Sequence, residues 1–273
     1  MIASTRSIIL LALLVIAKQV IAQDRKPFAS FIELPWRYVI GGSSGGRWLD
    51  SEAAGKRLTA PMTPYRIFTL KGETGRVTGA KASPEADVCP DVWMHQITPE
   101  PNPQDKSAIG VNAPWNPMPR QPSAESDIAP EVFEKAMSAL LISRGISRPQ
   151  VKITQLLRVD LDGDGKLETL MTVRHFNDEI ERLSVKAGDY CLVVMRRIIN
   201  GQVQTQMLDG NVYSMTDPNL SPSTYEVAGL LDLDGDGKLE VLVRTGYYEG
   251  GGMQVWQTRG DKLVKVIEMD CGV

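Results

Sequence analysis

The stretch Asp160-Leu161-Asp162-Gly163-Asp164-Gly165-Lys166-Leu167-Glu168 recurs unchanged, 72 positions later, as Asp232-Leu233-Asp234-Gly235-Asp236-Gly237-Lys238-Leu239-Glu240. Carboxylates at loop positions 1, 3, 5 and 9 can surround one hard cation, and the backbone carbonyl of position 7 can add a further oxygen. Glycines at positions 4 and 6 let the backbone wrap tightly. The unchanged duplication makes this nonapeptide the strongest functional signal in the chain.

Ligation by oxygen alone in a flexible loop favours Ca²⁺. Transition metals prefer His or Cys, and Mg²⁺ tends to keep its water. Without a cation, four carboxylates so close together would repel one another. The alternative is a pair of solvated Asp-Gly turns without metal. The duplication favours two calcium sites over this alternative.

The flanking residues indicate which kind of calcium motif this is. An EF-hand needs a Glu at loop position 12 and a helix on each side, but position 12 is Met171 in the first copy and Val243 in the second. The loops lead instead into short β-branched runs at 168–173 and 240–245. Before the first loop, five apolar residues fall on one parity, namely Val151, Ile153, Leu157, Val159 and Leu161. Alternation of this kind is typical of strands. The pattern therefore predicts a strand, a calcium loop and a second strand.

The repeat extends beyond the loops. Apolar runs at 190–195 and 203–208 flank an Asn200-Gly201 turn, and runs at 253–257 and 263–269 flank the turn Arg259-Gly260-Asp261. Asn-Gly is a strong hairpin signal because both residues tolerate positive φ. We therefore expect a mainly β chain with two four-stranded antiparallel, blade-like repeats, at 150–210 and 224–273. Such units need neighbours, so we expect them to pack face to face or against the N-terminal region.

These loops resemble those of the FG-GAP and VCBS repeats, in which D-x-D-G-D-G-x-x-D/E loops join two strands of a propeller blade. The resemblance covers residues 150–271, without the Phe-Gly and Gly-Ala-Pro signatures, and with two loops where a closed propeller repeats more often. It implies two Ca²⁺ sites, each held by four carboxylates and one lysine carbonyl. The implied ligands are Asp160, Asp162, Asp164, Lys166 and Glu168 in the first site, and Asp232, Asp234, Asp236, Lys238 and Glu240 in the second.

Residues 1–22 are typical of a signal peptide. Arg6 gives a positive start, an apolar run spans 8–16, and Val20-Ile21-Ala22 suits cleavage before Gln23. A retained N-terminal anchor is the alternative, although nine apolar residues are far fewer than the roughly 20 that span a bilayer. We therefore expect an exported protein, periplasmic or extracellular, without a transmembrane helix after cleavage. Loss of the segment's two basic residues takes the net charge of −3 to −5, which argues against a nucleic-acid partner.

In an exported protein the three cysteines can form a disulfide, because disulfides persist in oxidising compartments. Cys191 lies in an apolar strand and is expected to pack as a small hydrophobic residue. Cys89 and Cys271 lie in irregular segments, where a bridge forms more easily. Three cysteines permit three single pairings, and we predict the disulfide Cys89–Cys271.

The N-terminal region, 23–98, is expected to be β-rich, as part of a smaller, mixed α/β portion of the chain that includes one clear helix. Strands are predicted at 36–40, 65–70, 75–80 and 92–97, with the Gly-rich run 41–46 as a turn and a short helix at 51–58. Eight of the seventeen prolines lie between Pro99 and Pro130, so 99–129 is interpreted as a linker or surface loop anchored by Trp115. A helix is predicted at 130–145, with Pro130 in its first turn and Gly145 as its cap.

Three further motifs have plain structural interpretations. Gly42-Ser43-Ser44-Gly45-Gly46 matches the G-x-S-x-G nucleophile elbow, which requires a strand, a turn and a helix. Arg259-Gly260-Asp261 spells an adhesion tripeptide at a position where a turn is expected. The run 247–252, Tyr-Tyr-Glu-Gly-Gly-Gly, could present a contact surface but also suits a structural loop.

Two functional classes remain from the sequence. The first is a non-enzymatic, exported calcium-binding module that presents its loops to a protein or envelope partner. The second is an extracytoplasmic hydrolase in which calcium has a structural role. Only two histidines are present, and no acid–base cluster is recognisable outside the loops, which favours the first class.

Overall fold

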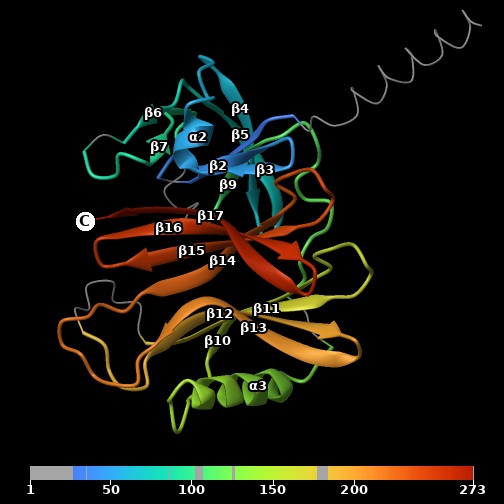
Figure 1. Ribbon diagram of the computed structural model, residues 1–273, viewed down its shortest axis with the longest axis vertical. Coiled ribbons are helices and arrows are strands. Elements are labelled where there is room, and N and C mark those ends of the chain that lie inside the picture. Colours follow the sequence, from blue (N-terminus) through green and yellow to red (C-terminus); the bar gives the residue numbers. More distant parts are fainter. Residues whose placement is uncertain are drawn as a thin grey trace, which may run out of the picture.

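The computed structural model describes residues 27–34, 36–85, 87–101, 107–124, 127–176 and 184–272. The expected signal peptide, 1–22, lies outside these ranges. The described chain is mainly β, as predicted. Three antiparallel sheets and one helix form successive layers of a stack, with the N-terminal sheet at one end and helix α3 at the other (Figure 1).

The N-terminal layer is a nine-stranded sheet in the order β6-β7-β2-β1-β9-β4-β5-β8, with β3 paired to β2. Its strands are β1 (Ala29–Glu33), β2 (Tyr38–Ser44), β3 (Arg47–Leu49), β4 (Thr63–Thr69), β5 (Gly72–Gly79), β6 (Ser83–Pro84), β7 (Trp93–Met94), β8 (Ile97–Thr98) and β9 (Ile109–Asn112). The short helix α2 (Ser51–Gly55) follows β3, and Asp50 caps it by accepting a hydrogen bond from the backbone N–H of Ala53 at 2.7 Å. The predicted helix at 51–58 is therefore present but shorter.

The sequence predicted that the preceding strand ends at Gly41, where the Gly-rich run begins, and this prediction is wrong. Strand β2 continues to Ser44, and only Gly45 and Gly46 form the turn. A Cβ on Gly41 would meet the Leu49 carbonyl oxygen at 2.4 Å. This glycine therefore permits close packing within the sheet rather than a turn.

The Pro-rich stretch also contains a strand that the sequence analysis missed. Strand β9 lies between β1 and β4, and Ile109 and Val111 are buried. The interpretation of all of 99–129 as a linker or surface loop is therefore wrong for these four residues. Gly110 lets β9 fit there, because a Cβ at this position would meet the Ile32 side chain at 2.5 Å.

The second half of the chain forms two four-stranded antiparallel sheets, each in sequential strand order. The first sheet contains β10 (Ile153–Val159), β11 (Glu168–His175), β12 (Tyr190–Ile199) and β13 (Gln202–Val212); the second contains β14 (Thr224–Leu231), β15 (Glu240–Tyr247), β16 (Gly250–Arg259) and β17 (Lys262–Gly272). These strands match the runs predicted from the sequence. The turn between β12 and β13 has φ of 52° at Asn200 and 76° at Gly201, as the Asn-Gly signal requires.

The two sheets pack face to face, and the second also packs against the N-terminal sheet. The shared face of the pair includes Leu157 and Val159 from the first sheet, Leu161 from its loop, and Val241 and Val243 from the second sheet. The other face of the second sheet packs on Phe31, Ile109 and Val111. Both packing arrangements considered for the repeats are therefore present, so that the second sheet is the buried middle layer.

Helix α3 (Pro130–Ser143) covers the remaining face of the first sheet (Figure 1). Phe133, Met137 and Leu141 are its buried residues, and they belong to one apolar cluster with the first sheet. Pro130 stands in the first turn, and Gly145 follows the end of the helix with φ of 99°. The predicted helix and its apolar face are confirmed.

The disulfide Cys89–Cys271 joins the N-terminal sheet's β6–β7 connection to the last strand, across 182 positions of sequence. This pairing was predicted. Cys191 takes no part in a disulfide and is buried in β12. No helix among the described residues is long and apolar enough to cross a membrane.

Candidate metal centres

Both nonapeptides form the connection between the first and second strands of their four-stranded sheet. In the second loop the oxygens of Asp232, Asp234 and Glu240 lie within 4.8 Å of one another, and in the first loop those of Asp160, Asp162 and Glu168 do the same. The structure therefore brings together the carboxylates of loop positions 1, 3 and 9 in both copies. A compact group of oxygens of this kind is suited to a hard cation.

The backbone of each loop is wrapped around the carboxylate at position 1. In the second loop, Asp232 accepts hydrogen bonds from the N–H groups of Gly235 at 2.7 Å and Gly237 at 3.0 Å. Both glycines have positive φ, 76° and 85°. A residue with a Cβ rarely adopts this conformation, which explains the glycines at positions 4 and 6.

The first loop repeats this arrangement in detail. Asp160 accepts from Gly163 at 2.7 Å and from Gly165 at 3.0 Å, and both glycines again have positive φ. Glu168 accepts a hydrogen bond from the N–H of Leu161 at 2.9 Å. Identical sequence has thus produced the same local geometry in two different layers of the stack.

Glu240 is the least exposed acid of the two loops, with 0% of its surface accessible. Its Oε2 accepts a hydrogen bond from the N–H of Leu233 at 2.8 Å, whereas no described residue donates to its Oε1. Burial raises the pKa of this carboxyl well above its usual value, and the three neighbouring aspartates add to the effect. A buried carboxylate oxygen without a donor is costly, and a cation among these carboxylates would satisfy it.

The two loops differ in burial. Asp232 and Asp234 are buried, and burial raises the pKa of Asp232 despite its two backbone hydrogen bonds. Asp160 and Asp162 are half-buried, while Glu168 is buried and has a raised pKa from desolvation. The second loop lies in the middle layer of the stack, which accounts for its lower exposure.

The aspartates at position 5 lie outside the three-carboxylate groups. Asp164 accepts from the backbone N–H of Lys166 at 2.8 Å and forms an ion pair with the Lys166 ammonium at 2.7 Å. These contacts lower the pKa of Asp164. Asp236 accepts from the N–H of Lys238 at 2.8 Å. The role of Asp164 and Asp236 as ligands, and that of the Lys166 and Lys238 carbonyls, stays a prediction.

Several residues that support the second loop were not identified from the sequence. Ser43 donates to the Leu233 carbonyl at 2.8 Å, and Gln257 donates to the Asp234 carboxylate at 3.2 Å. Trp115 donates from Nε1 to the Asp232 carbonyl at 2.9 Å. Trp115 was expected to be a packing anchor, and its position confirms this. Ser43 and Gln257 carry no local signal, because they reach the loop from strands remote in sequence.

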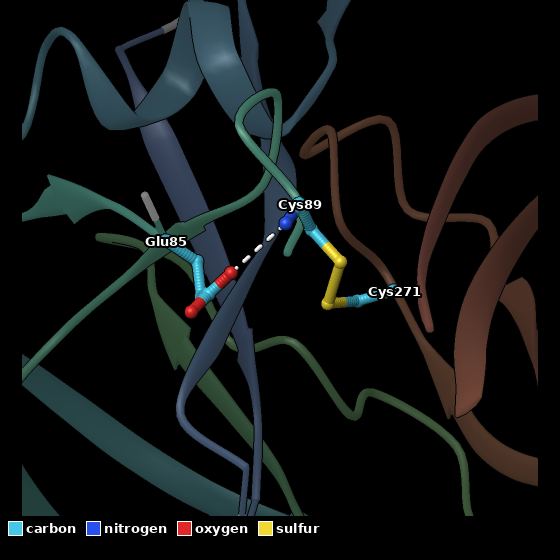
Figure 2. A group of neighbouring side chains, drawn as sticks. All are labelled: Glu85, Cys89 and Cys271. Atoms are coloured by element: carbon cyan, nitrogen blue, oxygen red, sulfur yellow. Dashed lines mark hydrogen bonds between the residues drawn. A yellow bond between two sulfur atoms is a disulfide. The ribbon is translucent and has the colours of Figure 1, made fainter. Parts of the chain in front are cut away.

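A third group of metal-binding residue types, Glu85 with Cys89 and Cys271, is accounted for by the disulfide (Figure 2). The two sulfurs are bonded to each other, so neither is available as a thiolate ligand. Glu85 accepts hydrogen bonds from the N–H groups of Cys89 at 2.9 Å and Val88 at 3.0 Å, which lower its pKa. Glu85 therefore organises the turn that carries Cys89.

The remaining sequence motifs take structural positions. The G-x-S-x-G run forms a strand, a turn and a strand, which is not the context of a nucleophile elbow. Arg259-Gly260-Asp261 is the exposed turn between β16 and β17. In the run 247–252, Tyr247 donates to the Asp270 carboxylate at 2.9 Å, while Tyr248 is 46% exposed.

His95 lies in a buried network instead of an accessible site. Its Nε2 is 2.9 Å from the hydroxyl of Tyr65, which is 3.1 Å from that of Ser30, and its Nδ1 contacts the Ala80 carbonyl. All three side chains are at most 1% exposed. Desolvation lowers the pKa of His95, which favours a neutral ring as a structural hydrogen-bonding group.

Comparisons of the chain with models of protein families, with curated proteins and with solved structures found no match.

Proposed function

We propose that this protein is an exported calcium-binding module with two FG-GAP/VCBS-type repeats, each holding one Ca²⁺ in its nonapeptide loop. The observation that carries the proposal is the buried carboxylate cluster around Glu240, whose Oε1 has no hydrogen-bond donor among the described residues. Native proteins rarely leave a buried polar atom without a partner, and a bound ion can act as that partner.

The donor set is suited to calcium. Asp160, Asp162 and Glu168 would hold the first ion and Asp232, Asp234 and Glu240 the second, with the lysine carbonyls at position 7 as further oxygens. Neither three-carboxylate group contains nitrogen or sulfur, which favours Ca²⁺ over zinc or copper. The ion would neutralise charge that otherwise opposes folding of the loop.

Two arrangements support the resemblance to blade repeats. Each loop joins the first two strands of a sequential four-stranded antiparallel sheet, and the two sheets stack face to face. Neighbouring blades of a propeller have the same relation. We propose that calcium stabilises this pair of sheets and that the stack presents its outer loops to a protein or envelope partner.

The test is the stoichiometry of calcium binding, measured by isothermal titration calorimetry on the mature protein. We expect two ions per chain, one after Asp162→Asn or Asp234→Asn, and none in the double variant. Lys166→Ala is the matched control within a loop, and it should still bind two ions because position 7 would contribute only its carbonyl. Absence of calcium binding, or two ions in the double variant, would refute the assignment.

Export has a separate test. When the full sequence is expressed, the mature protein should be recovered outside the cytoplasm, and N-terminal sequencing should show Gln23 as its first residue. A mature protein that still begins at Met1 would contradict this part of the proposal.

A further inference from the structure

The two candidate metal loops are in direct contact with each other. The N–H of Leu239, at position 8 of the second loop, donates to the carbonyl of Leu161, at position 2 of the first, at 2.8 Å. Both leucine side chains are buried in the apolar cluster shared by the two sheets. The backbone of one loop is therefore fixed partly by the backbone of the other.

A single segment of chain also contacts both loops. Residues 113–123, here called the bridging segment, lead from β9 to α3 along the side of the stack (Figure 1). At the second loop, the Pro117 carbonyl accepts from the N–H of Asp232 at 2.7 Å, and Trp115 donates to the carbonyl of the same residue. The end of the segment pairs with β10, where Ser123 forms a β-bridge with Arg158.

Arg120 of the bridging segment contacts both loops with one guanidinium group. Its Nε donates to the Asp160 carbonyl at 2.6 Å, and its Nη2 lies 3.1 Å from the Leu161 carbonyl and 2.8 Å from that of Gly237. These carbonyls occupy positions 1 and 2 of the first loop and position 6 of the second. A planar, rigid guanidinium can contact several acceptors at fixed angles, which the flexible ammonium of lysine cannot do.

On the basis of the calcium binding proposed above, we infer that the two loops form one coupled two-ion unit, in which Arg120 is the positioning residue and occupancy of either loop raises the affinity of the other. The carboxylates of a loop converge on an ion only when its backbone is ordered. An ion in one loop orders Leu161 or Gly237, and through Arg120 it orders the neighbouring backbone. The second ion then binds a loop that is already partly ordered, so its binding costs less conformational entropy.

Repulsion between the two ions opposes this coupling. Each loop carries four carboxylates, so a loop with its ion bound keeps a net negative charge and still attracts a second cation. Salt screens the repulsion between the ions, with a Debye length of about 8 Å at physiological ionic strength, and leaves the backbone contacts intact. The coupling should therefore be retained, or increase, when salt is added.

Trp115 lies beside the second loop and offers a signal for an ion bound there. A Cβ on Gly235 would lie 3.1 Å from the Trp115 ring, so Tb³⁺ bound in the second loop should show emission sensitised by tryptophan. Trp115→Phe should reduce this signal without abolishing it, because Trp48 donates to Gln257, which contacts Asp234. Asp234→Asn, which removes the second site, identifies the part of the signal that comes from the second loop. The experiment is a terbium titration of the mature protein and of its Asp162→Asn variant, which changes only the first loop.

We expect Asp162→Asn to lower the terbium affinity of the second loop at least about five-fold, the lower end of typical coupling between sites. In an Arg120→Gln background the same change should have a smaller effect on the second loop, and the direct hydrogen bond between Leu239 and Leu161 would carry the remaining coupling. Arg120→Lys should behave like Arg120→Gln, because it retains the charge but not the fork. Arg76→Gln, at an exposed arginine that pairs with Glu73, is the matched control and should keep the coupling.

An unchanged or increased affinity of the second loop in Asp162→Asn would overturn the inference, and this comparison does not depend on the folding of any Arg120 variant. Retention of full coupling in Arg120→Lys would overturn the positioning role of the guanidinium. Two ions that bind independently would refute the coupling alone, whereas failure of both Ca²⁺ and Tb³⁺ to bind would refute the proposed function as well.

Discussion

Replacement of Glu240 by glutamine should have opposite effects with and without calcium. In the metal-free protein the amide group would stand where the carboxylate Oε1 has no donor, beside the oxygens of Asp232 and Asp234. The amide can donate a hydrogen bond there, and the side chain can still accept from the N–H of Leu233. Removing a buried acceptor without a partner is worth about 1–3 kcal/mol, so Glu240→Gln should raise the stability of the metal-free protein.

With calcium present, the same variant should lose the contribution of the second site. At a free calcium concentration 100 times the dissociation constant, each independent site adds about 2.7 kcal/mol to the free energy of unfolding. The wild-type protein should therefore gain about twice this amount on going from EDTA to calcium. Glu240→Gln should lose at least the share of one site, and more if the two loops are coupled.

The assay is urea unfolding followed by circular dichroism at pH 8, in EDTA and in millimolar Ca²⁺, with the free energy extrapolated to water. Glu249→Gln is the control, because Glu249 is exposed at the turn between β15 and β16. A calcium response in Glu240→Gln as large as that of the wild type would show that this carboxylate is not a ligand. A loss of stability in EDTA would show that the carboxylate is satisfied without metal.

Two further predictions concern the contacts between the N-terminal sheet and the second half of the chain. Replacing Cys89 and Cys271 together by serine should lower the free energy of unfolding by up to about 5 kcal/mol in the chain-entropy model, measured by urea unfolding without reductant; an unchanged midpoint would contradict it. Glu33 is buried 3.0 Å from Arg244, and desolvation raises its pKa to about 7 from 4.5. Because the folded state holds this proton up to about pH 7 and the unfolded state loses it near 4.5, its contribution to stability is full at low pH and is lost as the pH rises through 7. Relative to Glu33→Gln, the free energy of unfolding of the wild type should therefore fall by up to about 3 kcal/mol between pH 4 and pH 8. The control is Glu226→Gln, at the exposed second partner of Arg244, which should show no such trend relative to the wild type. A constant difference between wild type and Glu33→Gln would refute the argument.

Much of the local structure could be predicted because it depends on neighbouring residues. The positive φ of Gly163, Gly165 and Gly201 follows from loop and turn chemistry that glycine alone allows at low cost. Alternating apolar residues predicted the strand before the first loop, short β-branched runs predicted the strands that follow both loops, and apolar residues sharing one helical face predicted α3. The position-9 glutamates were identified from their spacing, and both lie beside the aspartates of their own loop.

The two loops have identical sequences but differ in burial. The leucine at position 8 is 48% exposed in the first loop, as Leu167, and 0% exposed in the second, as Leu239. The same nine residues cannot predict this difference. It arises because the second loop lies between the N-terminal sheet and the first loop, whereas the first lies nearer the helical end of the stack. Strand β9 was missed for a related reason. The many prolines around it predicted a linker or loop, whereas its residues form a strand because they pair with β1 and β4, which are far away in sequence.

The two loops, the strands around them and the helix could be predicted because each depends on residue type and spacing within a short window. Three other features follow from the folding of the whole chain: the loops touch, Arg120 contacts both, and Glu240 is buried with one oxygen lacking a donor among the described residues. These features depend on the order in which apolar faces stack. That order is set by the total apolar surface removed from water, a property of the whole chain that no nine-residue window contains.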